Sequence, residues 1–163
     1  MPRPPAAPHI LVIDGAPHVL ALFRAALQRA GYRVSTDRCT SEHEPLLAAI
    51  KRVPPDLIIL DLVIRGERQG WQLLKLLQLD RETRQIPVIV SSAAVELVDH
   101  LQPRLDKMGA RVLRRPFHIA DLVEVTAAAL RRPRKGAARK QGRQAASRRG
   151  GEPASSHDAA ARR

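Results

Sequence analysis

The sequence predicts an α/β fold in which five parallel strands form a doubly wound sheet with the order 2-1-3-4-5. Two observations lead to it. Short apolar runs rich in valine and isoleucine alternate with stretches of helical periodicity over residues 8–131. The three most apolar runs, at 9–14, 56–61 and 87–92, have the composition of strands that are buried on both faces. Alternating strands and helices form parallel sheets, and right-handed crossovers then leave few arrangements, of which the flavodoxin-like order is the commonest simple one.

The five strands are expected where runs of strand length occur. They are HILVID (9–14), YRVSTD (32–37), DLIILD (56–61), PVIVSS (87–92) and ARVLRR (110–115). Valine and isoleucine are frequent in these runs, as they are in strands generally. The three most apolar strands are expected at the centre of the sheet.

The first two helices have recognisable faces and ends. One face of the first helix is made of Leu20, Phe23, Leu27 and Ala30. Gly31 follows this face, as expected for a residue that ends a helix. The second helix, SEHEPLLAAIKR, begins with a Ser41 cap and has Glu44 at the spacing of a capping box.

Three more helical patterns follow in the second half of the chain. They are GWQLLKLLQLD (70–80), the region 95–108 and IADLVEVTAAALRR (119–132). Gly109 marks the end of the fourth helix. Trp71 is expected to pack at the start of the third helix.

The ends of the chain differ from this domain in composition. Residues 131–163 carry eleven lysines and arginines against two acids, which gives +9 of the net charge of +12. Residues 132–163 contain no valine, isoleucine, leucine, methionine or aromatic residue, so they bury too little apolar area to offset the entropy of ordering. We therefore expect a disordered N-terminus at 1–7, one domain at 8–131 and a disordered basic tail at 132–163.

Several classes of protein are disfavoured by what the sequence lacks. No uncharged apolar window approaches the length of about 18 residues that a membrane span needs, and the start MPRPPAAPHI lacks the apolar run of a secretory signal. Cys39 is the only cysteine, so an internal disulfide is impossible. These features predict a cytoplasmic protein.

Enzyme motifs are also absent from the sequence. It contains no Gly-x-Gly-x-x-Gly fingerprint, no P-loop and no Gly-x-Ser-x-Gly elbow. The six histidines are scattered without the spacing of a metal site. The sequence thus predicts a protein that is not an enzyme of these classes.

Polar side chains stand at the ends of the predicted central strands. Asp14, Asp61 and Ser92 end three of them, and Arg115 ends the fifth strand. In a doubly wound sheet these ends converge on the edge where ligands collect. Two carboxylates beside a cation suit a divalent metal and a phosphoryl group, and a carboxylate can itself become phosphorylated. The plainer alternative is that the acids and Ser92 only cap the loops or helices that follow, and that Arg115 is one more cation in a basic segment.

Four motifs resemble those of the receiver domain of bacterial response regulators of the CheY type. They are ILVIDGAP, PPDLIILDLVIRG, IPVIVSSA and RRPF, in this order within residues 8–131. The resemblance implies that Asp61 is the phosphoacceptor and that the Ser92 hydroxyl contacts the phosphoryl group. It also implies Mg²⁺ held by Asp14, Asp61 and the backbone carbonyl of Val63. The peptide bond before Pro116 is expected to be cis, as in the family.

The chain departs from the family pattern at three positions. Gly15 stands where the family has a second acid, so Mg²⁺ is expected to bind more weakly. Arg115 replaces a lysine, and its planar guanidinium can grip phosphoryl oxygens in pairs. Val112 replaces the aromatic residue that usually flips on activation. Glu67, in a loop about one residue longer than usual, is a hypothetical substitute for the missing metal ligand.

The resemblance implies a stand-alone response regulator in a phosphorelay, that is, a two-component system. A sensor histidine kinase or phosphotransfer protein would phosphorylate Asp61, and an unknown downstream protein would read the surface that includes Glu96, His100 and Arg104. The alternative is a pseudo-receiver that is never phosphorylated and serves as a constitutive interaction module. A weaker alternative is binding of nucleic acid or another polyanion through the basic tail, which has no aromatic residue for base stacking.

Overall fold

A computed structural model describes residue 1 and residues 5–40 and 42–131 of the chain. Its sheet has five parallel strands in the order β2-β1-β3-β4-β5. The strands are β1 (His9–Ile13), β2 (Arg33–Asp37), β3 (Leu57–Leu60), β4 (Val88–Ser92) and β5 (Arg111–Arg114). Each strand end lies within one residue of its predicted place, and the predicted order is confirmed.

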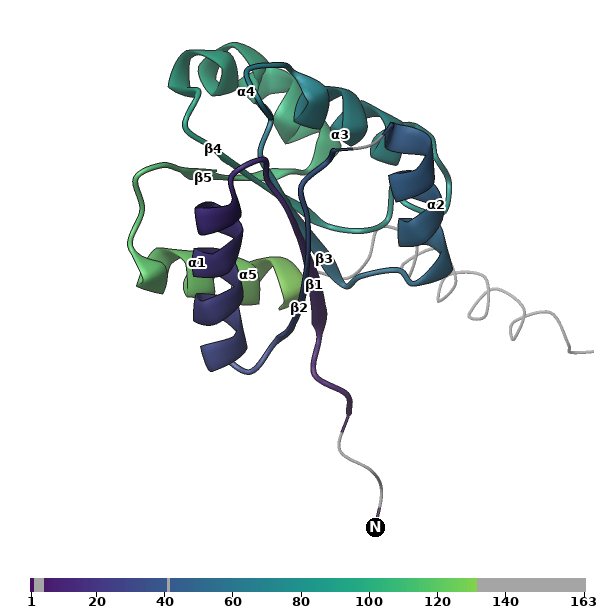
Figure 1. The fold of residues 1–163 in the computed structure, drawn as a ribbon, viewed down its shortest axis with the longest axis vertical. Coiled ribbons are helices and arrows are strands. Elements are labelled where there is room, and N and C mark those ends of the chain that lie inside the picture. Colours follow the sequence, from purple (N-terminus) through teal and green to yellow (C-terminus); the bar gives the residue numbers. More distant parts are fainter. Residues whose placement is uncertain (2–4, 41, 132–163) are drawn as a thin grey trace, which may run out of the picture.

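Five helices cover the two faces of the sheet (Figure 1). They are α1 (Pro17–Arg29), α2 (His43–Arg52), α3 (Gln69–Leu79), α4 (Val95–Met108) and α5 (Ile119–Arg131). Helices α1 and α5 lie on one face, whereas α2, α3 and α4 lie on the other. Strands that are covered by helices on both faces of the sheet are apolar at nearly every position. Their side chains point alternately to the two faces, and both faces are buried.

Two apolar clusters form the core, one on each side of the sheet. The larger one packs β-strand residues such as Leu60 against Trp71, Leu74 and Leu101 from the helices of its face. The smaller one packs Ile59 and Ile89 against residues of α1 and α5. Trp71 is buried at the start of α3, as predicted.

The helix ends differ from the predictions in two places. Ala30 is exposed rather than part of the buried face, because α1 ends at Arg29 and Ala30 is its C-cap residue, followed by Gly31 with a φ of +92°. Helix α2 begins at His43 with Glu42 as its N-cap residue, so the prediction of Ser41 as the cap is wrong. Ser41 itself lies outside the described residues.

The predictions for the end of α4 and for the two ends of the chain can be compared with the structure only where residues are described. Gly109 ends α4 in the left-handed conformation with a φ of +70°, as predicted. The predictions for the basic tail at 132–163 lie outside the described residues, as do those for residues 2–4. In the part of the chain that is described, no helix has both the length and the apolar character to cross a membrane.

Candidate functional site

The carboxyl edge of the sheet brings the predicted site residues together. The backbone N–H of Asp61 donates to the carbonyl of Ile13 over 3.0 Å, so Asp61 lies beside the residue that precedes Asp14. Asp14, Asp61 and Ser92 are buried, and Arg115 is partly buried. In Figure 1, β1 runs upward from the labelled N-terminus, so its carboxyl end is the end of the strand far from that label. The predicted convergence on one edge is therefore confirmed.

Arg115 is the centre of this cluster. Its Nη2 forms an ion pair with Oδ2 of Asp14, and its Nη1 lies 3.7 Å from Oδ2 of Asp61. Its Nε donates to the Ser91 hydroxyl over 3.2 Å, and Nη2 also donates to the Ser91 carbonyl over 3.0 Å. The guanidinium carbon lies 6.0 Å from the ring centre of Phe23. Contacts on several sides thus hold the guanidinium between the two carboxylates.

The peptide bond between Arg115 and Pro116 is cis, as the resemblance implied. Val112, at the position of the usual aromatic residue, is half-buried and packs against the larger apolar cluster.

The environment of Asp61 makes its carboxyl harder to ionise than an exposed one. Burial raises the pKa of the Asp61 carboxyl above its usual value, because a carboxylate loses its hydration there. Hydrogen bonds from the Val63 N–H and the Ser92 hydroxyl, together with the Arg115 charge, lower this pKa, but burial outweighs them. The ionised carboxylate therefore costs folding free energy at neutral pH.

Replacing Asp61 by asparagine is expected to give a small increase in the free energy of unfolding at neutral pH. Because the folded-state pKa lies above the unfolded one, the cost of the charge is full above the folded pKa. It disappears at acid pH, where both states are protonated. Urea denaturation of both proteins across pH 4 to 8 (about the range where aspartate titrates and beyond) should show the difference shrinking toward acid. A variant less stable than wild type at neutral pH would contradict the prediction.

The polar ends of the strands also cap the loops that follow, as the plainer alternative supposes. Oδ1 of Asp14 accepts from the N–H of Ala16 over 2.8 Å, although the N-cap residue of α1 is Ala16 itself. Oδ1 of Asp61 accepts from the N–H of Val63 over 3.1 Å, and the Ser92 hydroxyl accepts from the N–H of Ala94 over 3.3 Å. These hydrogen bonds use Oδ1 of each acid, so Oδ2 of each acid still faces Arg115. The two acids therefore cap the loops and also take part in the cluster with Arg115.

The donor set does not fit a divalent cation well. Gly15 supplies no carboxylate, and a Cβ on it would lie 3.0 Å from Cγ2 of the buried Ile64. The Glu67 carboxylate accepts a hydrogen bond from the Gln69 side chain over 2.9 Å and does not form a group of three with Asp14 and Asp61. Among the described residues, no three histidine, cysteine, aspartate or glutamate side chains gather as a metal site would require. Asp14 and Asp61 are the two carboxylates present, and Arg115 lies next to both.

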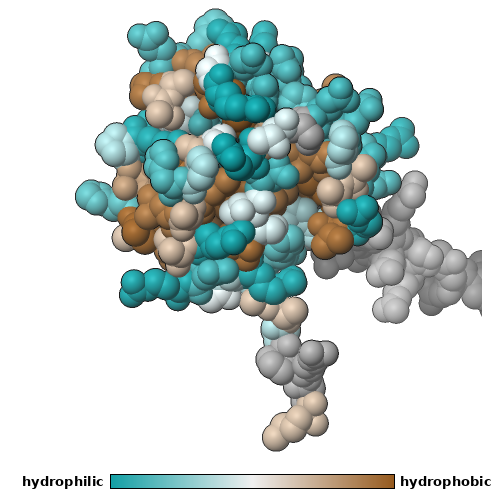
Figure 2. Space-filling view, viewed as in Figure 1, coloured by the Kyte–Doolittle hydropathy of each residue, from teal (hydrophilic) through white to brown (hydrophobic). Residues whose placement is uncertain are grey.

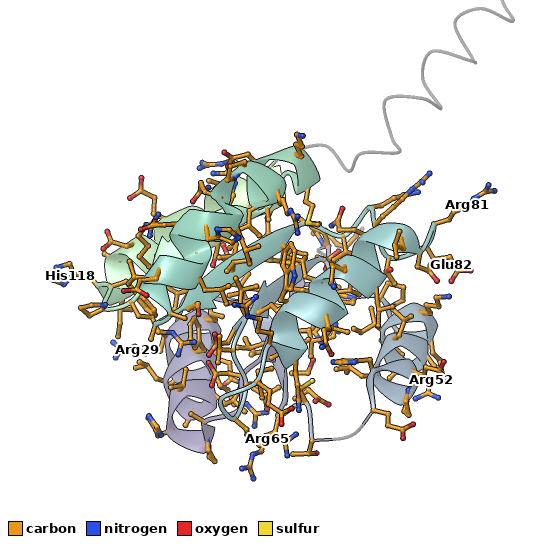
Figure 3. The ribbon with its side chains drawn as sticks, turned by 90° about the horizontal axis from the view of Figure 1, so that it is seen from above. Arg29, Arg52, Arg65, Arg81, Glu82 and His118 are labelled. Carbon is orange, nitrogen blue, oxygen red and sulfur yellow. The ribbon has the colours of Figure 1, made fainter. Side chains whose placement is uncertain are left out.

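Two residues that shape the site were missed by sequence reasoning. Gly70, in the first turn of α3, lies against the backbone of Asp61, because a Cβ on it would be 1.7 Å from the Asp61 carbonyl oxygen. A glycine inside a helix is unfavourable, which is a signal that could have pointed to this close approach. Arg65, with a φ of +53°, donates from Nη2 to the Cys39 carbonyl over 2.8 Å. It thereby ties the loop after β3 to the loop after β2, and Figure 3 shows it at the margin of the molecule.

An apolar groove borders the site on its α1 side. It has a volume of about 380 Å³ and is lined by Val19, Leu22, Phe23, Ala93, Arg115, Pro116 and Phe117. Leu22 also lines a neighbouring groove of about 460 Å³ between α1 and α5. Figure 2 shows apolar side chains gathered over these two helices. An exposed apolar surface next to the carboxylates is typical of a protein-binding face.

Comparisons with known proteins agree with this geometry. The family described as the response regulator receiver domain matches residues 10–127. The DNA-binding dual master transcriptional regulator RpaA of Synechocystis sp. is 30% identical over 125 residues, which cover 77% of this chain and 50% of RpaA. Protein PilH of Pseudomonas aeruginosa is 27% identical over 122 residues, which cover 74% of this chain and 96% of PilH. The chain thus spans about half the length of RpaA, but nearly all of PilH.

A solved structure with the same fold contains a metal. The receiver domain of a sensor histidine kinase from Pseudomonas aeruginosa, with a magnesium ion coordinated in its active site cleft, superposes with a TM-score of 0.63. It is 20% identical and covers 77% of this chain and 98% of that one, which shows a common fold.

Proposed function

The chain belongs to the response regulator receiver domain family, and from this premise we propose that it accepts a phosphoryl group on Asp61 in a phosphorelay. Receiver domains are signalling modules rather than classical enzymes. The observation that carries the proposal is the cluster of Asp61 with Asp14, Ser92 and Arg115 at the carboxyl edge of the sheet. The order of the motifs along the chain supports the same assignment.

The proposed chemistry uses Oδ2 of Asp61, the carboxylate oxygen that lies next to Arg115. Its Oδ1 accepts from the Val63 N–H, which leaves Oδ2 as the nucleophile. Oδ2 attacks the phosphorus of a phosphohistidine on the donor protein, the oxygen–phosphorus bond forms and the phosphorus–nitrogen bond breaks. The imidazole leaves with the electron pair and takes up a proton. The Arg115 guanidinium and the Ser92 hydroxyl would hold the phosphoryl oxygens, which the position of Arg115 next to Oδ2 of Asp61 supports.

Receiver domains interact with sensor kinases or phosphotransfer proteins, and we propose such a partner as the donor. The apolar groove that Leu22, Phe23 and Phe117 line beside Arg115 supports this, because a donor must bring its histidine close to Asp61. Output would pass to a downstream protein through the surface of α4, β5 and α5. Glu96, His100 and Arg104 are exposed on α4, as that role needs.

Receiver domains generally bind Mg²⁺ in this site, and we propose that this chain binds it more weakly. Asp14, Asp61 and the carbonyl of Val63 would be the ligands. The loss of an acid at Gly15 removes one hard oxygen ligand, and the guanidinium of Arg115 repels a second cation.

The alternative is a pseudo-receiver that binds partners constitutively without phosphorylation. Gly15 and the ion pair between Arg115 and Asp14 favour it, because they change the usual arrangement of charges. Binding of nucleic acid or another polyanion through the basic tail rests on residues outside the described part of the chain.

The decisive experiment is the intact mass of the protein after incubation with acetyl phosphate or phosphoramidate. We expect the gain of one phosphoryl group in wild type and none in Asp61→Asn. Asp56→Asn is the matched control, because Asp56 lies just before β3, at its opposite end, and accepts from the backbone N–H of His9 over 2.8 Å. Absence of the gain in wild type with both donors would favour the pseudo-receiver.

A further inference from the structure

The carboxylate pair at this site already has a cation, and it belongs to the chain. We propose that the guanidinium of Arg115 is the resident cation of the site and neutralises Asp14 and Asp61 in place of a divalent metal. Transfer of a phosphoryl group to Asp61 then requires no metal, a consequence that rests on the proposed function. The role of Arg115 in Mg²⁺ binding concerns the unphosphorylated protein and does not depend on the proposed function.

The position of the guanidinium supports this role. Nη2 is ion-paired with Asp14, and Nη1 is 3.7 Å from Asp61, so one planar group spans the two carboxylates. A lysine ammonium has all its donors on one nitrogen, so it cannot contact the two acids through separate nitrogens as this guanidinium does. A divalent ion that used Oδ2 of both acids would have to approach the guanidinium closely or displace it.

The guanidinium is held in place rather than free to swing away. Nε and Nη2 donate to the hydroxyl and the carbonyl of Ser91, which is fully buried, over 3.2 and 3.0 Å. The backbone N–H of Arg115 is 3.4 Å from the Ser92 carbonyl. The ring of Phe23 backs the group at 6.0 Å. Moving the side chain to admit a metal would break the contacts of the guanidinium with Ser91, Asp14 and Phe23 together.

The charges of the site are consistent with an internal cation. Asp14, Asp61 and Arg115 leave a net charge of about −1 when all are ionised, where a third acid at position 15 would leave about −2. The missing acid and the bridging guanidinium thus act in the same direction, because each lowers the attraction for an added cation. Ile64 lies close beside Gly15, because a Cβ on Gly15 would be 3.0 Å from Cγ2 of Ile64.

Nη1 is the part of Arg115 left for a phosphoryl group. Its distance of 3.7 Å from Asp61 is longer than a hydrogen bond, whereas Nε and Nη2 are committed to Ser91 and Asp14. A phosphoryl group on Oδ2 of Asp61 would place its oxygens next to Nη1. Arg115 would thereby stabilise Asp61 both before and after phosphorylation.

The test is calorimetric titration with Mg²⁺ alone on the full chain. We expect wild type to bind Mg²⁺ so weakly that the titration does not reach saturation at millimolar Mg²⁺. Arg115→Gln removes the internal cation and should bind Mg²⁺ roughly tenfold more tightly or better. Wild type that binds Mg²⁺ saturably with an affinity equal to that of Arg115→Gln would overturn the proposal.

Arg114→Gln is the matched control, because it removes the same charge from the neighbouring residue. Arg114 is exposed and pairs with Asp99 of α4 over 2.7 Å, away from the carboxylate pair. Its Mg²⁺ titration should match that of wild type, and an equal gain there would show a general charge effect and overturn the proposal. If Arg115→Gln does not fold, Arg115→Lys decides the question: tighter binding than wild type supports the proposal and unchanged binding overturns it.

Phosphorylation by acetyl phosphate in the presence of a chelator tests the consequence for transfer. We expect the same rate for wild type with EDTA and with Mg²⁺. A rate that falls by more than about tenfold with EDTA would overturn metal-free transfer. Absence of phosphorylation under both conditions would count against the proposed function, whereas the Mg²⁺ titration would still decide the role of Arg115.

Discussion

Replacing Gly70 with alanine is expected to lower the free energy of unfolding by roughly 3 kcal/mol. The new Cβ would lie 1.7 Å from the carbonyl oxygen of Asp61 and 2.7 Å from its carbonyl carbon. Neither atom belongs to a flexible side chain, so either α3 or the strand end must move. Alanine would otherwise favour the helix by about 1 kcal/mol, which makes a loss of stability diagnostic of the clash. The same shift would displace Asp61, and phosphorylation should fall with stability.

Urea denaturation of Gly70→Ala beside Gly66→Ala measures this effect. Gly66 lies four residues away with a φ of +77°, and a Cβ there meets no atom within 4 Å. Its replacement should cost only about 1 kcal/mol, the strain of a left-handed alanine. Equal losses for the two variants would show that the contact between Gly70 and Asp61 is not the cause.

Replacing Phe23 with alanine is expected to cost about 3–5 kcal/mol, the range for a buried aromatic residue. The Phe23 side chain is 1% exposed and belongs to the smaller apolar cluster. Its ring centre lies 5.5 Å from that of Phe117 at an angle of 49°, and its face backs the Arg115 guanidinium. The variant therefore loses core packing and also the support of the site's cation.

The matched control is Leu22→Ala, one residue away on the same helix. Leu22 is 46% exposed, so its truncation should cost well under half as much in urea denaturation. Similar losses for the two variants would mean that Phe23 is not a core residue. A Phe23→Leu variant keeps most of the apolar volume, so its smaller loss separates packing from ring contacts.

The fold could be predicted from the sequence because the burial of each strand determines the pattern of apolar residues within that strand. Strands such as Leu57–Leu60, covered by helices on both faces, are apolar at every position, and this distinguishes them from the edge strands. The site residues could be predicted for a related reason. Asp14, Asp61 and Ser92 interrupt or end such runs, and parallel strands bring their carboxyl ends to one edge.

Helix starts were less predictable than strands. Ser41 and Glu44 have the spacing of a capping box, yet α2 starts at His43 with Glu42 as its N-cap. The spacing rule describes local hydrogen bonds, whereas the packing of Leu46 and Ile50 against the sheet determines where the helix lies.

The sequence by itself determined the order of the strands, the two core faces and the identity of the polar residues at the sheet edge. Only the tertiary structure decided how those residues pair. It placed Arg115 between Asp14 and Asp61, turned Glu67 toward Gln69, and set Gly70 against the Asp61 backbone. The physical reason is that burial is recorded in the pattern of each segment along the chain. Contacts between loops depend instead on distances of a few ångströms, which are set by the packing of segments that lie far apart in the sequence.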